Sequence, residues 1–545
     1  MDSSTHPSRR KFTIVTLIIG VFLFLVAIQV ELVPLFRYNP DGDHSNKELE
    51  PHEVSPSGNN TIELSQDMDP FQLEGNKEHN PFLTMFPERS PSDQERFLGY
   101  LPHSGFHNQR MTLETALRLA AHLNRTLLLP PLYMCEKALN IPWDRPPSLL
   151  LKWSNIRRDG VEFCRDYDVT SHPSMSRNEL WKALMNPLRD RDMECALYHA
   201  WTTTPWTYFY DLPKVLTGVV HIAAANQSEP IRVFDRPNMT IPWLVERLGI
   251  TENLEKEIYW VNDTVRYDYR ILDDSEYDYR LNPELPGKYQ QTILLSDLQA
   301  RQEKIIHFGS LFGPDRVESR SDSHIALANY INNNLDIWNQ KILDATKLAE
   351  TQIEAWIEMT GRAIPGFLGA HLRTADGQFM NVIDRSVQVI VEWVRERVEQ
   401  DRQYLKEHAT PGPAPMQADT EKRQEEDEPT FLDRCMDQPP ESPLIFLSTD
   451  VHHPRSSPIL SDFLDEFPCT MVLSDFPETV KLLDMIHNSV DNVHMLPYMI
   501  ALMDANMAAK GRDFQGTENS TFSAYISDHL WPEYHPGQHL TAAFL

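Results

Sequence analysis

The sequence predicts an α/β protein that contains a pair of Rossmann-like domains facing a cleft. Two stretches of the chain each alternate short apolar runs with segments of helical periodicity, and buried strands that alternate with helices are typical of parallel sheets. The chain has 545 residues, which is too many for one compact core. We therefore assign residues 94–300 to an N-terminal domain and residues 301–545 to a C-terminal domain.

The first stretch opens with residues 97–101, an apolar run that suits a short buried strand. A tight turn at 104–110 follows, and apolar residues then recur at helical spacing through position 121. Residues 126–129 predict a second buried strand. Further on, we expect an aromatic cluster to belong to the core or to a domain interface rather than to a ligand platform: Trp201, Trp206, Tyr208, Phe209 and Tyr210.

The second stretch begins with an apolar strand at 304–308 and continues with helices near 323–338 and 339–361. Strands follow at 366–374, 443–447 and 470–473, and a helix is expected at 498–509. Ligands of open parallel sheets bind beyond the carboxyl ends of the strands. We therefore expect the functional polar side chains at those ends.

The amino terminus predicts the compartment. Residues 12–30 carry no charge and, as a helix, would be about 28 Å long, close to the thickness of a bilayer core. Arg9, Arg10 and Lys11 precede this run, so the positive-inside rule keeps residues 1–11 cytoplasmic. A cleavable signal peptide is the alternative, but the run is longer than its usual apolar core and lacks a small-x-small cleavage site. We expect an uncleaved single-pass type II signal-anchor at 12–30, a disordered stem at 31–93 and a lumenal or extracellular remainder.

Charge excludes one class of partner. The chain has 50 Lys and Arg against 79 Asp and Glu, a formal net charge of −29, which argues against nucleic-acid binding. Residues 406–440 are rich in proline and acids, and we expect them to form a disordered surface insertion. Much of the negative charge then lies outside the folded domains.

A lumenal location gives meaning to the cysteines and the glycosylation sequons. Five cysteines would face an oxidising lumen, and sequence alone does not give their pairing: Cys135, Cys164, Cys195, Cys435 and Cys469. No C-x-x-C pair is present, and His452 with His453 lacks a spaced third ligand, so we expect no metal site. Six asparagines begin N-x-S/T sequons: Asn59, Asn124, Asn226, Asn238, Asn262 and Asn519.

The predicted strand at 366–374 carries the first candidate for chemistry. Its period of two places Gly369, His371 and Arg373 on one face, with Arg373 at the carboxyl end. A guanidinium there could bind a ligand diphosphate and neutralise the charge of a departing nucleoside diphosphate. Asp376 could orient Arg373 or hold a ligand hydroxyl. The alternative is a buried Arg–Asp structural pair with a core histidine.

The second candidate is the segment 511–523, between two expected helices. Gly516 allows a close backbone turn, and Ser520, Thr521 and the first free N–H groups of the following helix could bind an anion. An ordinary Ser or Asn helix cap is the alternative. A buried phosphate turn would leave Asn519 without a glycan.

The third candidate is the turn at 104–110. Gly105 permits an unusual backbone and a close approach to a ligand. Asn108 and Arg110 can hydrogen-bond a sugar or a phosphate. The alternative makes Asn108 a helix N-cap and leaves Arg110 on the surface.

These three segments together resemble the motifs of the GDP-fucose protein O-fucosyltransferase family. Residues 105–110 with 124–131 resemble its first motif, and His371-Leu372-Arg373 with Asp376 resembles its His-x-Arg motif. Residues 514–517 with 520–523 resemble its carboxyl-terminal nucleotide-sugar motif. The three lie in the expected order over residues 95–530.

The resemblance implies a GT-B fold with GDP-fucose held mainly by the second half, and an inverting, metal-independent transfer to an acceptor glycoprotein or glycan, with no cofactor beyond the donor. It implies that Arg373 contacts the diphosphate and the glycosidic oxygen and stabilises the leaving group. The remaining residues expected to contact the donor are Gly105, His107, Asn108, Arg110, His371, Asp376, Asp513, Gly516, Ser520, Thr521 and Phe522. The cleft is expected to be positive through Arg110 and Arg373.

The sequence also departs from the family pattern. The His-x-Arg motif continues Thr374-Ala375-Asp376 rather than Arg-Gly-Asp, and Asp513 lies one position away from an acid found in some members. The first motif carries His107 and no glutamate where some members keep a catalytic one. His107 as general base and a mechanism without a dedicated base therefore both stay open. Another nucleotide sugar, a glycan acceptor and a non-catalytic glycoprotein-binding relative are the alternative functions.

Overall fold

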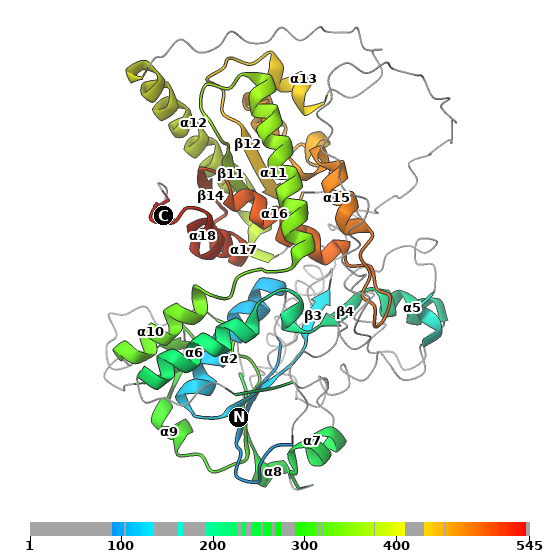
Figure 1. Ribbon diagram of the computed structural model, residues 1–545, viewed down its shortest axis with the longest axis vertical. Coiled ribbons are helices and arrows are strands. Elements are labelled where there is room, and N and C mark those ends of the chain that lie inside the picture. Colours follow the sequence, from blue (N-terminus) through cyan, green and yellow to red (C-terminus); the bar gives the residue numbers. More distant parts are fainter. Residues whose placement is uncertain are drawn as a thin grey trace, which may run out of the picture. The chain divides into compact units, whose positions relative to one another are not determined.

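A computed structural model describes the chain in segments: residues 90–102, 105–135, 162–166, 191–225, 232–235, 241–251, 254–263, 268–273, 289–313, 315–318, 320–374, 377–408, 430–451 and 453–540. All of them belong to one compact unit, Asn76–Leu545 (Figure 1). The predicted cytoplasmic tail, the anchor at 12–30 and nearly all of the predicted stem lie outside these residues. Within them, no helix combines the length and the apolar character needed to cross a bilayer.

The first half is built on a five-stranded parallel sheet in the order β5-β2-β1-β9-β6. The strands are β1 (Phe97–Tyr100), β2 (Thr126–Leu129), β5 (Val233–Asp235), β6 (Ile258–Val261) and β9 (Ile305–Phe308). Alternate side chains pack on opposite faces, one against α2 (Phe106–His122) and the other against α7 (Ile241–Leu248). The predicted strand, turn, helix and strand at the start of this half are therefore present.

The strand β9 corrects one expectation. We expected residues 304–308 to open the second half, but β9 lies between β1 and β6 and is hydrogen-bonded to both. Ile305 and Ile306 are fully buried in the two faces of that sheet. The apolar run is thus a central strand of the first sheet, because a buried parallel strand pairs with any neighbour of the same direction, near or far in sequence.

Smaller elements complete the first half. A three-stranded parallel sheet has the order β10-β7-β8, and β3 and β4 form an antiparallel pair. The disulfide Cys164–Cys195 joins a 3₁₀ turn to a helix beside that pair. The predicted aromatic cluster is buried, as expected. The bounds are β3 (Leu132–Cys135), η1 (Glu162–Cys164), α5 (Arg191–His199), β4 (Trp201–Thr204), η3 (Trp206–Tyr208), α6 (Leu212–Ala225), α8 (Leu254–Glu257), β7 (Tyr269–Leu272), β8 (Gln291–Leu294), α9 (Leu295–Gln299), β10 (Val317–Glu318) and α10 (Asp322–Asn332).

The second half is built on a four-stranded parallel sheet in the order β13-β12-β11-β14. The strands are β11 (Leu368–Leu372), β12 (Ile445–Thr449), β13 (Thr470–Met471) and β14 (Asp513–Gln515). Figure 1 shows α12 (Ile383–Glu407) on one side of these strands and α11 (Gln340–Thr360) with α16 (Leu496–Ala509) on the other. The prediction of an α/β fold with parallel sheets is confirmed.

The predicted alternation along β11 is also confirmed. Leu368, Ala370 and Leu372 pack in the cluster that α12 covers. Gly369 faces α16 so closely that a Cβ there would lie 2.0 Å from the carbonyl oxygen of Ala508. The face that carries His371 is therefore the α16 face. The other elements of this half are η5 (Gly377–Asn381), α13 (Phe431–Met436), η6 (Pro454–Ser456), α14 (Ser461–Glu466), η7 (Leu473–Asp475), α15 (Pro477–Asp484), α17 (Thr521–Tyr525), the π-helix η8 (Ile526–Leu530) and α18 (Trp531–Tyr534).

Both ends of the predicted disordered insertion at 406–440 belong to helices. α12 continues through Glu407, and α13 begins at Phe431 with a capping box formed by Thr430 and Asp433. The disulfide Cys435–Cys469 then ties α13 to the segment before β13. Residues 409–429 lie outside the described part of the chain.

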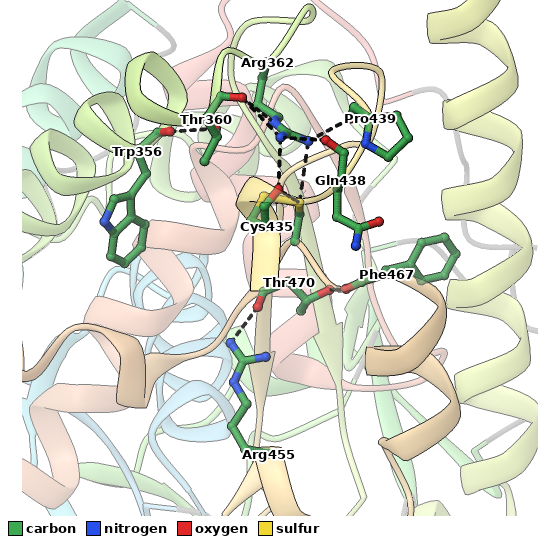
Figure 2. The surroundings of a disulfide bond; sticks show 10 residues. Trp356, Thr360, Arg362, Cys435, Gln438, Pro439, Arg455, Phe467 and Thr470 are labelled. Carbon is green, nitrogen blue, oxygen red and sulfur yellow. Dashed lines mark hydrogen bonds between the residues drawn. A yellow bond between two sulfur atoms is a disulfide. The ribbon is translucent and has the colours of Figure 1, made fainter. Parts of the chain in front are cut away.

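A buried arginine reinforces this disulfide (Figure 2). Arg362 donates to the carbonyl oxygens of Thr360, Cys435, Gln438 and Pro439 at 2.9–3.3 Å and lies 3.7 Å from Cys469 Sγ. It thereby joins the end of α11 to the chain after α13. A cavity of about 480 Å³ lies beside Gln438, Pro439 and Cys469, and neither His371 nor Arg373 lines it.

Candidate functional site

Segments far apart in the sequence meet at the carboxyl edge of the second sheet. The ring of Phe522 in α17 lies with its centroid 4.5 Å from that of His371 and 5.2 Å from that of His107 in α2. His107 also packs against Tyr525 at 4.5 Å. The structure therefore brings the three segments singled out in the sequence into contact, through one residue of the first half and several of the second.

A hydrogen-bond network fixes the backbone around Arg373. Ser523 Oγ lies 2.6 Å from His371 Nδ1 and accepts the Thr517 N–H at 3.0 Å. Thr517 Oγ1 donates to the His371 carbonyl at 3.0 Å and accepts the Arg373 N–H at 2.9 Å. The loop after β14 is thus hydrogen-bonded to the end of β11 at the His371 carbonyl and to the backbone N–H of Arg373 directly after the strand.

His371 is a neutral histidine in this network. It is 3% exposed, and burial, followed by the nearby charge of Arg373, lowers its pKa to about 3. When Ser523 Oγ donates to Nδ1, the ring proton lies on Nε2. His371 can therefore donate a hydrogen bond from Nε2 without adding charge to the site.

Arg373 keeps part of its side chain accessible. The side chain is 32% exposed, and Nε lies 3.3 Å from Asp450 Oδ2. Its Cζ lies 5.9 Å from the ring of Phe379 in η5. A partly exposed guanidinium at the carboxyl edge of a parallel sheet is placed to bind an anionic ligand.

The segment at 511–523 both caps a helix and packs tightly. Ser520 is the N-cap of α17 and accepts the Ser523 N–H at 3.3 Å, so the helix-cap alternative describes its side chain. A Cβ on Gly516 would lie 2.5 Å from Ser523 Cβ, which explains why a glycine stands there. Thr521 and Phe522 are half-buried. Asn519 is exposed and has a φ of +61°. The expectation that a buried turn would cover its side chain is therefore wrong.

His107 is buried among aromatic rings. It is 8% exposed, and neither ring nitrogen has a hydrogen-bond partner among the described residues. Burial, followed by the charge of Arg110, lowers its pKa well below the ordinary value. His107 is therefore neutral near pH 7 and a weak base, which counts against it as a general base.

The turn that precedes α2 differs from its prediction in three ways. Gly105 is the N-cap with φ −73° and ψ 177°, an extended conformation that any residue adopts, and a Cβ there would meet no atom within 4 Å. Asn108 lies inside the first turn of α2 and is not the cap; its buried Oδ1 has no partner among the described residues. Arg110 is 3% exposed, forms an ion pair with buried Glu114 and lies over the ring of Tyr525. Arg110 is therefore neither on the surface nor open to a phosphate.

The predicted site acid Asp513 stands apart from Arg373. Asp513 begins β14 and pairs in register with Leu368 at the start of β11, whereas Arg373 follows the end of β11. Asp513 Oδ2 lies 3.4 Å from Arg397 of α12, which makes a structural ion pair. Asp376 lies outside the described residues.

Sequence reasoning missed Asp504. This acid lies in α16, is 8% exposed and accepts a hydrogen bond from Ser448, the residue that pairs with His371 across β11 and β12. Burial raises its pKa to about 7, and its Oδ1 has no partner among the described residues. The available signal was one acid in the otherwise apolar run 496–509.

Among the described residues, the cluster offers an accessible guanidinium, neutral hydrogen-bonding groups and aromatic faces. Such a set can hold a planar base or sugar beside a diphosphate. Within the described part of the chain, no group of three or more His, Cys, Asp or Glu side chains could hold a metal ion.

Comparisons with known proteins identify a short sequence match. The chain is 53% identical over 38 residues to O-fucosyltransferase 30 of Arabidopsis thaliana; the match spans 7% of this chain and 8% of that protein. No family model matches the chain. The short match confirms that the chain resembles O-fucosyltransferases, as its three segments predicted.

Among solved structures, fucosyltransferases align over most of the chain. Crystal structures of POFUT1, without ligand and in complex with GDP-fucose, align with TM-scores of 0.34 and 0.33 at 10% and 11% identity. They cover 83% of this chain and 99% and 98% of POFUT1. NodZ α-1,6-fucosyltransferase, soaked with GDP-fucose, aligns with a TM-score of 0.28 at 13% identity over 79% of this chain and 92% of that one.

Proposed function

We propose that the protein is a GT-B glycosyltransferase that transfers fucose from GDP-fucose to a Ser or Thr hydroxyl of a secretory-pathway protein. The transfer inverts the anomeric centre and needs no metal. The proposal starts from the three motif-like segments of the sequence and from the short match to O-fucosyltransferase 30. One observation carries the proposal. His371 of β11, Arg373 directly after β11, Thr517 and Ser523 after β14, and His107 of α2 form one cluster at the carboxyl edge of the second sheet.

The cluster suits the leaving group of this reaction. A bond forms between the acceptor oxygen and the anomeric carbon, the bond from that carbon to the diphosphate breaks, and GDP leaves with the electron pair. Arg373 then stabilises the charge that grows on the diphosphate, and a guanidinium fixed before the reaction does so without reorganisation. The hydroxyl proton leaves to solvent or to the departing phosphate. The low pKa of His107 favours this route over a dedicated histidine base.

The two disulfides support the proposed compartment. Cys164–Cys195 and Cys435–Cys469 both join segments about thirty residues apart, with separations of 31 and 34. Disulfides of this kind persist in oxidising compartments and are rare in the cytosol. Together with residues 1–30, they support a type II membrane protein of the Golgi or endoplasmic reticulum whose folded part is lumenal.

Calorimetry on the full chain in detergent tests the proposal. We expect GDP and GDP-fucose to bind, and UDP-sugars not to bind. Equal affinity for GDP-mannose would point to another GDP-sugar, and binding without release of fucose to any acceptor would point to a non-catalytic relative. No binding of GDP would refute the proposal.

Substitution of the proposed leaving-group residue gives the second test. Arg373→Ala should leave the fold intact and lower turnover at least about 100-fold, the scale for the loss of one charge donor to a transition state. Arg395→Ala is the matched control, since Arg395 is an exposed arginine whose Nε also pairs with a carboxylate, Glu466, at 2.6 Å. Wild-type turnover in Arg373→Ala would remove Arg373 from its proposed role.

A further inference from the structure

We infer that Asp450 is a positioning residue that sets the direction of the Arg373 guanidinium before the donor arrives; the inference rests on the proposed function. Asp450 follows β12, and β12 pairs with β11 in register up to Leu372 and Thr449. Asp450 therefore stands beside Arg373 at the same edge of the sheet. No sequence motif singled it out.

The two oxygens of Asp450 hold different parts of the neighbouring chain. Oδ2 lies 3.3 Å from Arg373 Nε. Oδ1 accepts the Thr374 N–H at 2.7 Å and the Thr374 hydroxyl at 2.9 Å. One carboxylate thus holds the side chain of Arg373 and the backbone turn directly after it.

This geometry matters because an arginine side chain is long. A free guanidinium samples many rotamers, and ordering it upon ligand binding costs conformational entropy. The backbone of Arg373 is already fixed by Thr517, and Asp450 adds a fixed anion on the Nε side. The guanidinium is then ordered in advance for a diphosphate, which is what preorganised charge stabilisation requires.

The substitution Asp450→Asn separates the ion pair with Arg373 from the hydrogen bonds with Thr374. An amide retains one oxygen, which can still accept the two hydrogen bonds from Thr374. The amide nitrogen replaces the oxygen that faces Arg373, so the ion pair is lost while the turn is kept. Thr374→Val is the complementary variant, since it removes one hydrogen bond to Oδ1 and leaves the ion pair.

A double-mutant cycle tests whether Asp450 acts through Arg373. The four proteins are wild type, Asp450→Asn, Arg373→Ala and the double variant, all as full chains, and the first readout is the dissociation constant for GDP by calorimetry. We expect Asp450→Asn to weaken GDP binding about tenfold, within the range of interaction energies between residues in contact. In the Arg373→Ala background the same change should alter binding less than about twofold, because coupled residues are non-additive.

The second readout does not need a donor. The midpoint of thermal unfolding should fall with Asp450→Asn in wild type by more than it does in Arg373→Ala. The control Glu466→Gln breaks the exposed Arg395–Glu466 pair and should change neither readout.

Each outcome decides something. Equal effects of Asp450→Asn in both backgrounds would overturn the inference, as would a Thr374→Val variant that loses as much GDP affinity as Asp450→Asn. If the wild type binds no GDP, the proposed function fails, and the unfolding midpoints still show whether Asp450 holds Arg373.

Discussion

A single methyl group at position 516 should dismantle the network that holds His371. A Cβ on this residue would lie 2.5 Å from Ser523 Cβ, 2.6 Å from Ser523 Oγ and 3.2 Å from Phe514 Cε1. Ordinary contacts begin near 3.4 Å, so Gly516→Ala must displace Ser523 by about 1 Å. Ser523 is fully buried at the start of α17, so a shift must disturb its neighbours in a packed interior.

The loss of stability can be derived from the hydrogen bonds that Ser523 makes. Its Oγ lies 2.6 Å from His371 Nδ1 and 3.0 Å from the Thr517 N–H, and a shift of this size breaks both hydrogen bonds. Two hydrogen bonds contribute about 1 kcal/mol each. Overpacking a filled site costs about 1–3 kcal/mol more. Gly516→Ala should therefore lower the free energy of unfolding by about 3–5 kcal/mol.

Denaturant unfolding of the full chain measures this change. Gly361→Ala is the control: it adds a methyl into space where no atom lies within 4 Å. Unlike Gly516, Gly361 has a positive φ of 59°, so this change should cost only about 1–2 kcal/mol of backbone strain. Adding Ser523→Gly to Gly516→Ala should recover the overpacking part and leave the hydrogen bonds lost. A Gly516→Ala protein as stable as the Gly361→Ala control would refute the reasoning.

Three further changes test other parts of the structure. The native pKa of Asp504 is raised to about 7 from 3.8, so the folded state holds a proton that the unfolded state loses. Stability from this group is therefore complete below about pH 4 and is lost as the pH rises to about 7, at no more than about 1.4 kcal/mol per pH unit; Asp504→Asn should remove that slope from unfolding curves measured across the range. Replacing Cys435 and Cys469 together by Ala opens a loop of 34 residues and should lower the free energy of unfolding by about 4 kcal/mol, and an unchanged value would contradict the described pairing. His107→Phe should not lower the unfolding midpoint, because both ring nitrogens lack partners among the described residues; a large loss of stability would reveal a hydrogen bond that the structure does not have.

Local pattern was enough to predict the elements that carry the site. The period of two along 366–374 placed His371 and Arg373 on the α16 face, and β2 (Thr126–Leu129) matches its predicted bounds. These features depend on the alternation of side chains between the two faces of a strand, which can be read directly from the sequence. The same reasoning placed β9 in the wrong sheet, because strand order depends on long-range pairing.

Burial and partners were harder to predict. Arg110 was expected to face a phosphate, yet Glu114, one helical turn later, neutralises it in the core. The pair stands at i and i+4, a spacing that the sequence contains but that does not tell a surface pair from a buried one. Asp450 and Asp504 were missed because each meets its partner across strands or helices separated by 50 residues or more in the chain.

Because the chain has a net charge of −29, the proposed diphosphate needs a local positive group at the site. The two arginines that were expected to make the cleft positive each have an acidic partner, Glu114 for Arg110 and Asp450 for Arg373. The first pair is buried and closed, whereas the Arg373 and Asp450 side chains are 32% and 26% exposed. Of these two arginines, Arg373 is therefore the one that the proposed diphosphate can reach, from the side that Asp450 does not occupy. It follows that raising the salt concentration should weaken GDP binding in wild type more than in Arg373→Ala, since screening acts on the accessible charge. Equal salt dependence in the two proteins would mean that another cation carries the interaction.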